Sequence, residues 1–230
     1  MMRRFAALAL FLIAFGARAE DPDALWKLVD GKCAPAAEAH LPPAPCTMVD
    51  LRRGMAVLKD RNGATQYLVI PTARITGIED PAVLADNASF AVAWETRRLV
   101  SAKLGADVAD PSVSIAVNSM NGRSQNQLHL HVDCLDAGTR DQLKGEAIGP
   151  GWAPVRAPLA GHRYIARLIP GDSLDHVNPF RLLADHVGGA IGDWTLVLTR
   201  SADLPGFILL ARNDGRANGE ELQDHTCLGH

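Results

Sequence analysis

Residues 118–134, NSMNGRSQNQLHLHVDC, run from a polar loop that contains a glycine into a segment in which polar and apolar side chains alternate. Such alternation predicts a β-strand after the loop. Successive side chains of a strand point to opposite faces, so one face should carry Gln127, His129, His131 and Asp133, and the other Leu128, Leu130, Val132 and Cys134. The two histidines are therefore predicted to point the same way from an apolar backing.

The histidine pair can be interpreted in three ways. A chain with eight histidines can carry a His-x-His pair on its surface by chance. Two imidazoles on one face of a strand can instead share a metal ion, although Gln127 is a poor third ligand and we expect no metal. The third interpretation is a catalytic histidine, because a neutral imidazole is nucleophilic at physiological pH and can form a covalent intermediate.

The N-terminus predicts export. Two arginines follow the first two methionines, the 13 residues 5–17 are apolar, and Ala17-Arg18-Ala19 is an Ala-x-Ala end. This pattern is typical of a secretory signal peptide over residues 1–19. The apolar run is shorter than the about 20 residues of a membrane-spanning helix, so cleavage is favoured over a retained anchor.

Length and charge limit the possible classes of protein. The 230 residues, 47% of them hydrophobic, suffice for one domain with an appendage. Without residues 1–19 the chain has 20 basic and 26 acidic side chains, a net charge of about −6. Proteins that bind nucleic acid concentrate positive charge, so we expect no nucleic-acid partner.

Four cysteines in an exported chain are expected to form disulfides. Three pairings are possible. Cys33 and Cys46 bracket a short proline-rich loop, which favours a local bridge and leaves Cys134 to pair with Cys227. Two buried free thiols in place of the second bridge remain an alternative.

Upstream of the motif, the patterns predict a hairpin and a long helix. The expected elements are a helix over 23–29 that ends near Gly31, strands over 55–59 and 66–71, a helix from Asp80 to Gly105, and a strand over 113–117. The turn between the first two strands contains Asn62-Gly63, a strong hairpin signal. The last of these strands delivers Asn118 and the loop to the motif.

Downstream of the motif, the patterns again alternate between helix and strand. The expected elements are a helix over 136–148, strands over 163–169, 195–199 and 207–211, a helix from Asn178 to Gly188, and a short helix over 218–227. The break GPGWAP over 149–154 suggests a core over 20–148 and a C-terminal extension over 149–230. The hairpins 55–71 and 195–211 are similar in shape, so the extension is a possible degenerate repeat.

The order of these elements resembles the histidine-triad superfamily. The resemblance rests on YLVIP at 67–71, Arg74-Ile75, the long helix, Asn118 and QLHLHV at 127–132, with Gln127 in place of the first of three alternating histidines. Within it the chain is most similar to bacterial CDP-diacylglycerol pyrophosphatases, through KDR at 59–61, GRSQ at 122–125 and ELQDH at 221–225. The expected fold is therefore α+β, with a histidine-triad-like antiparallel sheet, packed helices and an α/β C-terminal extension on the same sheet.

The resemblance implies a role for each polar residue of the motif. His129 falls on the position of the nucleophile, with His131 and Gln127 as flanking donors. Neutral donors and close backbone approach suit phosphoryl chemistry. We therefore expect Ser124, Asn118 and Arg123 to bind the phosphates of the substrate.

The implied reaction is hydrolysis of CDP-diacylglycerol to CMP and phosphatidate through a nucleotidyl-histidine, with no cofactor. The expected partners are this lipid-linked nucleotide, water and a membrane surface, and the expected location is the periplasm, associated with the inner membrane. One alternative is a periplasmic hydrolase or nucleotidyl transferase for soluble nucleotide conjugates. Another is a non-enzymatic protein that binds a metal or ligand through His129 and His131.

Overall fold

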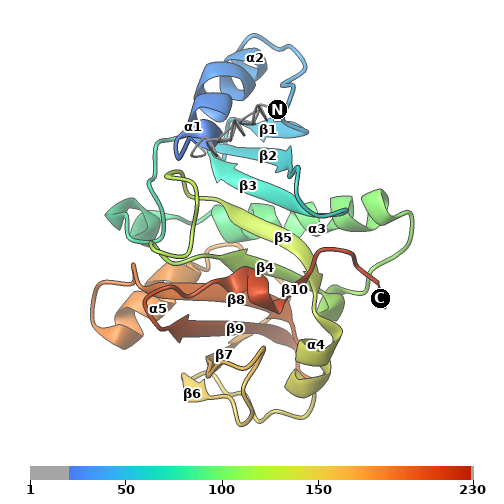
Figure 1. The fold of residues 1–230 in the computed structure, drawn as a ribbon, viewed down its shortest axis with the longest axis vertical. Coiled ribbons are helices and arrows are strands. Elements are labelled where there is room, and N and C mark those ends of the chain that lie inside the picture. Colours follow the sequence, from blue (N-terminus) through green and yellow to red (C-terminus); the bar gives the residue numbers. More distant parts are fainter. Residues whose placement is uncertain (1–20, 229–230) are drawn as a thin grey trace, which may run out of the picture.

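The computed structural model describes residues 21–228, in which ten strands form one antiparallel sheet (Figure 1). The order across the sheet is β1-β2-β3-β5-β4-β8-β9-β7-β6, and β10 pairs with β5 outside this path. The strands are β1 Met48–Asp50, β2 Met55–Lys59, β3 Tyr67–Pro71, β4 Val113–Val117, β5 Leu130–Leu135, β6 Ala153–Pro154, β7 Ile165–Pro170, β8 Trp194–Arg200, β9 Gly206–Asn213 and β10 Gln223–Asp224. The α+β class is confirmed, and the signal peptide predicted over 1–19 lies outside the described residues.

The two predicted hairpins are present and flank the centre of the sheet. Strands β2 and β3 pair from Met55 with Pro71 to Lys59 with Tyr67. Strands β8 and β9 pair in the same antiparallel manner. Between the hairpins lie β5 and β4, so the histidine motif occupies the middle of the sheet.

The first helix is longer than predicted. Helix α1 (Ala24–Leu28) continues through a π-helical turn, Val29–Cys33, into α2 (Ala34–Glu38), so Gly31 does not end it. Val29 and Cys33 are buried against the sheet. Tertiary packing of these side chains outweighs the low helix propensity of glycine.

The long helix predicted from Asp80 is wrong at its start. A 3₁₀ helix, Pro81–Ala85, comes first, and α3 (Ser89–Leu104) begins only after a break. The Asp86 carboxylate accepts hydrogen bonds from the backbone N–H groups of Ala88 and Ser89. These bonds satisfy backbone N–H groups at the start of a new helix, which ends as predicted at Gly105, in the left-handed conformation.

The C-terminal third differs from its prediction at two helices. Helix α4 (Ala137–Leu143) is shorter than 136–148, whereas α5 (Pro179–Val187) ends at Gly188 as expected. The helix predicted over 218–227 is wrong: a 3₁₀ helix, Gly219–Leu222, leads directly into β10. Pairing of Gln223 and Asp224 with β5 supplies the backbone hydrogen bonds that a helix would have supplied.

Two different layers cover the sheet. Helices α3 and α5 pack on the face that carries Leu130 and Val132, and in Figure 1 α3 lies behind the sheet. The other face, which carries Leu68 and His131, is covered by the N-terminal helices over β2 and β3 and by residues 217–222, the first part of the C-terminal segment 217–228. Cys227, near the end of this segment, packs with Cys134 on the α3 face. The histidine side chains therefore lie between the N-terminal helices and the C-terminal segment.

Both predicted disulfides are present. Cys33 is bonded to Cys46, with a Cα–Cα distance of 5.8 Å, and Cys134 is bonded to Cys227, at 5.4 Å. The second bridge joins β5 to the C-terminal segment across 93 residues of sequence. It holds that segment beside the histidine motif.

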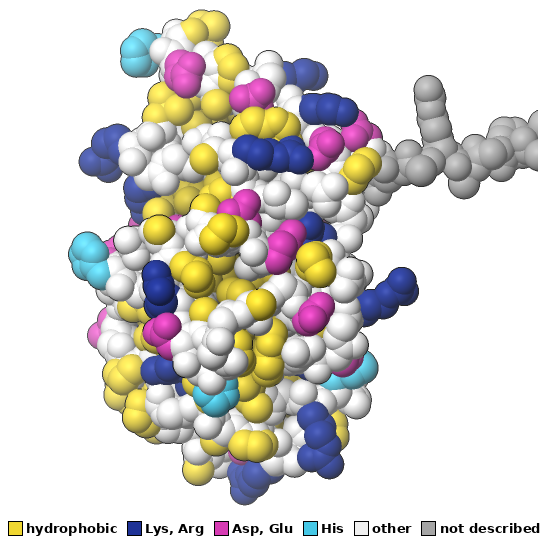
Figure 2. Space-filling view, turned by 90° about the vertical axis from the view of Figure 1, so that its left-hand side faces the viewer, with side chains coloured by type: hydrophobic (Ala, Val, Ile, Leu, Met, Phe, Trp, Pro, Cys, Tyr) yellow, Lys and Arg dark blue, Asp and Glu magenta, His cyan; other side chains and the backbone are white. Residues whose placement is uncertain are grey.

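The surface has no concentration of one charge on the face drawn in Figure 2. Basic and acidic side chains are interspersed there, and hydrophobic side chains form a band between them (Figure 2). Of the helices between residues 21 and 228, none is long and apolar enough to cross a bilayer.

Candidate active site

His129 stands one residue before β5 and has a fixed tautomer. Its Nδ1 lies 2.7 Å from the backbone oxygen of Gln127. Because a carbonyl oxygen only accepts hydrogen bonds, Nδ1 carries the proton and Nε2 keeps its lone pair. Burial lowers the pKa of His129, so the ring is neutral at physiological pH.

His131 lies next to His129 on the same face, as the alternation predicted. The ring centroids are 4.7 Å apart, in an edge-to-face arrangement. Burial, with the neighbouring His129 and His225, holds the pKa of His131 well below its ordinary value. Neither ring nitrogen of His131 makes a hydrogen bond to the described residues, although Nδ1 lies 3.1 Å from Glu220 Oε2.

Gln127, predicted as a donor that flanks His129, uses its amide to hold the neighbouring backbone. Its side chain is fully buried, and its amide donates to the backbone oxygens of Pro71 and Ala73, at 2.9 and 2.8 Å. Its side-chain oxygen accepts from the N–H of Ile75. Both hydrogens of the amide are committed to the loop after β3, so Gln127 fixes the backbone that holds His129.

Asn118 joins the motif to the C-terminal segment. Its Oδ1 accepts a 2.9 Å hydrogen bond from the N–H of Gly219, and its Nδ2 donates to Glu220 Oε1 at 2.6 Å. The backbone of Gly219 packs directly against the sheet, because a Cβ at this position would lie 2.7 Å from Thr195 Oγ1. Asn118, which was predicted to bind a phosphate, therefore uses its amide to place Glu220.

Arg123 is committed to another partner. Its guanidinium makes a bidentate ion pair with Glu79, at 2.7 and 2.6 Å, and is nearly buried. Gly122 also serves the fold, because a Cβ there would lie 2.5 Å from the backbone oxygen of Ala217. The structure thus brings Ser124 and Asn118 together with the histidines, and turns Arg123 away towards Glu79.

A pocket of about 450 Å³ opens over the two histidines. Its polar lining comes from Lys59, Asp60, Arg61, Asn62, Asn118, Ser124, Gln125, His129, His131 and Glu220, and its apolar lining includes Ala24, Leu25, Leu28, Pro45, Leu58 and Leu68. The two kinds of lining suit a ligand with a charged part and an apolar part.

Four charged residues of this pocket, Lys59, Asp60, Arg61 and Glu220, were not among the predicted site residues. Lys59 and Arg61 stand at the β2–β3 turn, and burial lowers the pKa of the Lys59 ammonium. Lys59 and Arg61 belong to the KDR sequence noted above for its likeness to the family, so a signal for them existed. Glu220 carried no such signal, because only the folded C-terminal segment brings it to the pocket.

A second polar cluster lies beside the site. The fully buried Asp133 accepts hydrogen bonds from Thr65 Oγ1, at 2.6 Å, and from His225 Nδ1, at 2.9 Å. The Asp133 carboxylate raises the pKa of His225. Within residues 21–228, Asp133, Cys134 and Cys227 are the one group close enough to share a metal ion, but their sulfurs are bonded to each other and offer no thiolate.

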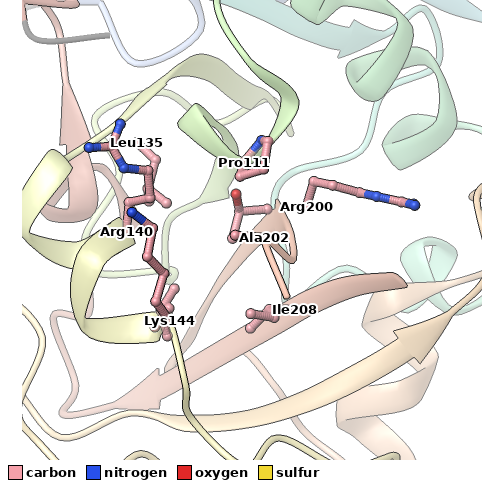
Figure 3. A pocket seen from close by; sticks show the side chains of 9 residues that line it. Pro111, Leu135, Arg140, Lys144, Arg200, Ala202 and Ile208 are labelled. Carbon is pink, nitrogen blue, oxygen red and sulfur yellow. The ribbon is translucent and has the colours of Figure 1, made fainter. Parts of the chain in front are cut away.

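A recess at the other end of β5 does not form a comparable site. It is lined by Leu135, Arg140, Lys144, Arg200 and five further residues, and encloses about 10 Å³, room for about one water molecule (Figure 3). Lys144 pairs with Asp141 and Arg200 with Asp172. In Figure 3 the Arg200 side chain points away from Arg140 and Lys144, so these cations do not converge on a ligand.

Comparison with known proteins identifies the family. The profile of the family described as CDP-diacylglycerol pyrophosphatase matches residues 20–229. The chain belongs to the CDP-diacylglycerol pyrophosphatase family. A CDP-diacylglycerol pyrophosphatase of Yersinia pestis is 40% identical over 245 residues, which cover 98% of this chain and 94% of the relative. All residues of the pocket over His129 and His131 lie within the part that matches this pyrophosphatase family.

Proposed function

We propose that this protein hydrolyses the pyrophosphate bond of CDP-diacylglycerol to CMP and phosphatidate, with His129 as the nucleophile. Membership of the CDP-diacylglycerol pyrophosphatase family supports the substrate and the reaction. The observation that carries the residue assignment is the hydrogen bond from His129 Nδ1 to the Gln127 carbonyl, which leaves Nε2 unprotonated in the pocket.

The proposed first step forms a nucleotidyl-histidine. The Nε2 electron pair attacks the cytidylyl phosphorus, the bond from this phosphorus to the bridging oxygen breaks, and phosphatidate leaves with the electron pair. Water then attacks the same phosphorus, the P–N bond breaks, and CMP is released. Positioning and stabilisation of charge are the main requirements of such transfers.

Lys59, Arg61 and Ser124 are the proposed phosphate-binding residues. All three line the pocket with His129, and two of them are cations. Positive charge stabilises the phosphate oxygens in the transition state. His131 adds a neutral N–H donor, and Gln127 acts on the nucleophile through the backbone.

The apolar side of the pocket is the proposed entrance for the lipid. Leu25, Leu28 and Leu58 form this side next to the polar lining. Exposed hydrophobic residues of the same N-terminal region, Leu41, Met48 and Leu51, are then candidates for contact with a membrane surface. The two disulfides fit an exported protein, and we propose the periplasm as its location, after removal of residues 1–19.

The test uses the purified protein with CDP-diacylglycerol in mixed micelles and with a water-soluble CDP conjugate. His129→Ala is expected to abolish CMP release without unfolding the protein, and quenched wild-type enzyme should carry CMP on His129. Arg123→Gln is not a suitable control because its ion pair is structural, so the exposed His186→Gln serves instead. Full activity of His129→Ala contradicts the mechanism, and a preference for the soluble conjugate favours the alternative substrate class.

A further inference from the structure

Glu220 occupies a position that the reaction above leaves unassigned. It lines the pocket together with His129 and His131, and comes from the 3₁₀ helix Gly219–Leu222. Its Oε2 lies 3.1 Å from His131 Nδ1, and the ring of His131 contacts that of His129. The Glu220 carboxylate is therefore separated from the proposed nucleophile, His129, by the ring of His131.

Neighbouring side chains hold the Glu220 carboxylate in place. Asn118 Nδ2 donates to its Oε1 at 2.6 Å, and Gln66 Nε2 donates to its Oε2 at 3.2 Å. The Asn218 side chain accepts from the Glu220 N–H, which fixes the start of the 3₁₀ helix. Each carboxylate oxygen has two acceptor sites, so these hydrogen bonds leave capacity for a water molecule.

The residues that follow lock the C-terminal segment from the opposite side. Glu221 accepts hydrogen bonds from Tyr164 Oη, at 2.6 Å, and from the buried Arg212, at 3.1 Å. Cys227 then bonds the segment to β5. Adjacent glutamates thus have separate functions in the fold: Glu221 anchors the segment, and Glu220 faces the pocket.

Hydrolysis of a nucleotidyl-histidine needs an acceptor for a proton of water. His129 Nε2 is bonded to phosphorus at that stage. His131 would become a second cation beside the nucleotidyl-imidazolium if it took the proton, at a buried position. Glu220 would become neutral instead, and among the described residues that line the pocket the other carboxylate is Asp60.

Asp60 is less suited to this role. Its Oδ1 accepts a hydrogen bond from the N–H of Asn62, within the turn of its own hairpin, and its backbone oxygen accepts from Lys59. Asp60 therefore belongs to the loop that carries the cations, whereas Glu220 is adjacent to the histidine pair.

We propose that Glu220 is the general base that activates water in the second half-reaction, an inference that rests on the nucleotidyl-histidine proposed above. One O–H bond of the water breaks, and its proton goes to Glu220. The oxygen electron pair forms a new bond to phosphorus, while the P–N bond breaks and its pair returns to His129 Nε2. CMP leaves, His129 is neutral again, and Glu220, which is partly exposed, releases the proton to solvent.

The test separates the two half-reactions in rapid-quench experiments on the full chain. Glu220→Gln is expected to release phosphatidate at close to the wild-type rate, to accumulate CMP bound to His129, and to release CMP about 10²–10⁴-fold more slowly. The exposed Asp185→Asn, outside the pocket, is the matched control and should release both products at the wild-type rate, whereas Asp60→Asn should accumulate no CMP on His129.

Two results would overturn the assignment of Glu220. One is CMP release from Glu220→Gln at the wild-type rate, and the other is an equal slowing of both half-reactions. Glu220→Ala with added formate gives an independent measurement, since formate should restore CMP release if a carboxylate is what the step lacks, and no restoration contradicts the proposal. Failure of the underlying mechanism is distinguishable, because His129→Ala would then remain active and wild-type enzyme would carry no CMP.

Discussion

The side-chain oxygen of Gln125 accepts a 3.0 Å hydrogen bond from the backbone N–H of Leu25, 100 residues earlier in the chain. The amide nitrogen of Gln125 donates to the backbone oxygen of Asp21, also at 3.0 Å. Asn126 adds a backbone hydrogen bond to Pro22. The loop that precedes His129 is thereby joined to the start of α1, which forms the apolar side of the pocket.

Gln125→Ala is expected to weaken substrate binding more than chemistry. The change removes two hydrogen bonds, at about 1 kcal/mol each, and releases Leu25 from the pocket. KM for CDP-diacylglycerol should rise about tenfold, with kcat within about threefold of wild type. Steady-state kinetics in mixed micelles measures both, and Gln125→Glu, which keeps the acceptor for Leu25, should lie between. An unchanged KM in Gln125→Ala would contradict the role of this link.

Lys59→Gln is expected to lower kcat about 10²-fold, because it removes positive charge from the pocket over His129. The exposed Lys32→Gln, from the N-terminal helical region, is the matched control and should leave kcat unchanged. Rates of CMP release at saturating substrate give the comparison. Equal rates for the two variants would remove Lys59 from the catalytic site.

Removal of the Cys134–Cys227 bridge should affect stability and activity together. A closed loop of this length contributes on the order of 4 kcal/mol to the free energy of unfolding. In Cys134→Ala/Cys227→Ala the C-terminal segment loses its bond to β5, so Glu220 is held less firmly. We expect a lower urea midpoint and a reduced rate of CMP release even where the protein is folded, as circular dichroism can verify.

The Cys33→Ala/Cys46→Ala variant is the control for this effect. The Cys33–Cys46 bridge closes a loop far from Glu220 in sequence, so its removal should leave the Glu220-dependent step of CMP release unchanged. A Cys134→Ala/Cys227→Ala protein with full activity below its unfolding transition would show that the bridge does not support the site.

The ion pair of His225 with Asp133 predicts a pH-dependent stability. Asp133 raises the folded-state pKa of His225 above that of the unfolded state, about 6.5. The stabilisation is then fully present below pH about 6.5 and is lost as the pH rises through the folded-state pKa. Urea unfolding of wild type and His225→Gln should show the largest difference in acid and a shrinking one above neutrality.

The opposite trend would contradict this assignment, and the exposed His186→Gln provides the comparison. His129 and His131 have lowered pKa values, so their contribution to the free energy of unfolding increases as the pH rises. The pH dependence of the wild-type protein alone therefore does not isolate the contribution of His225. Only the difference between variants isolates His225.

Local patterns were sufficient for the parts of the fold with local causes. The period of two in residues 127–134 predicted that His129 and His131 share a face, and the edge-to-face contact of their rings confirms it, although β5 begins only at Leu130. Asn62-Gly63 predicted the hairpin, and the short proline-rich loop between Cys33 and Cys46, with the even number of cysteines, predicted both bridges. In each case the residues themselves restrict the backbone or the pairing.

Features with distant partners were not predictable in this way. Nothing near Arg123 indicates that Glu79 pairs with it, and nothing near Gln127 indicates that its amide serves the loop after β3. The helix predicted over 218–227 failed because strand pairing with β5 replaces it. Glu220 could be assigned to the pocket only once that segment had been placed.

The pocket is closed by segments from opposite ends of the described chain, α1 on one side and Glu220 on the other. A chain still being made, or one cut short before residue 217, contains the proposed nucleophile but lacks one wall of the pocket. The proposed site is consequently complete only after residues 217–227 have been made and Cys227 has bonded to β5. During synthesis, the chain thus contains His129 before it contains the segment that places Glu220 in the pocket.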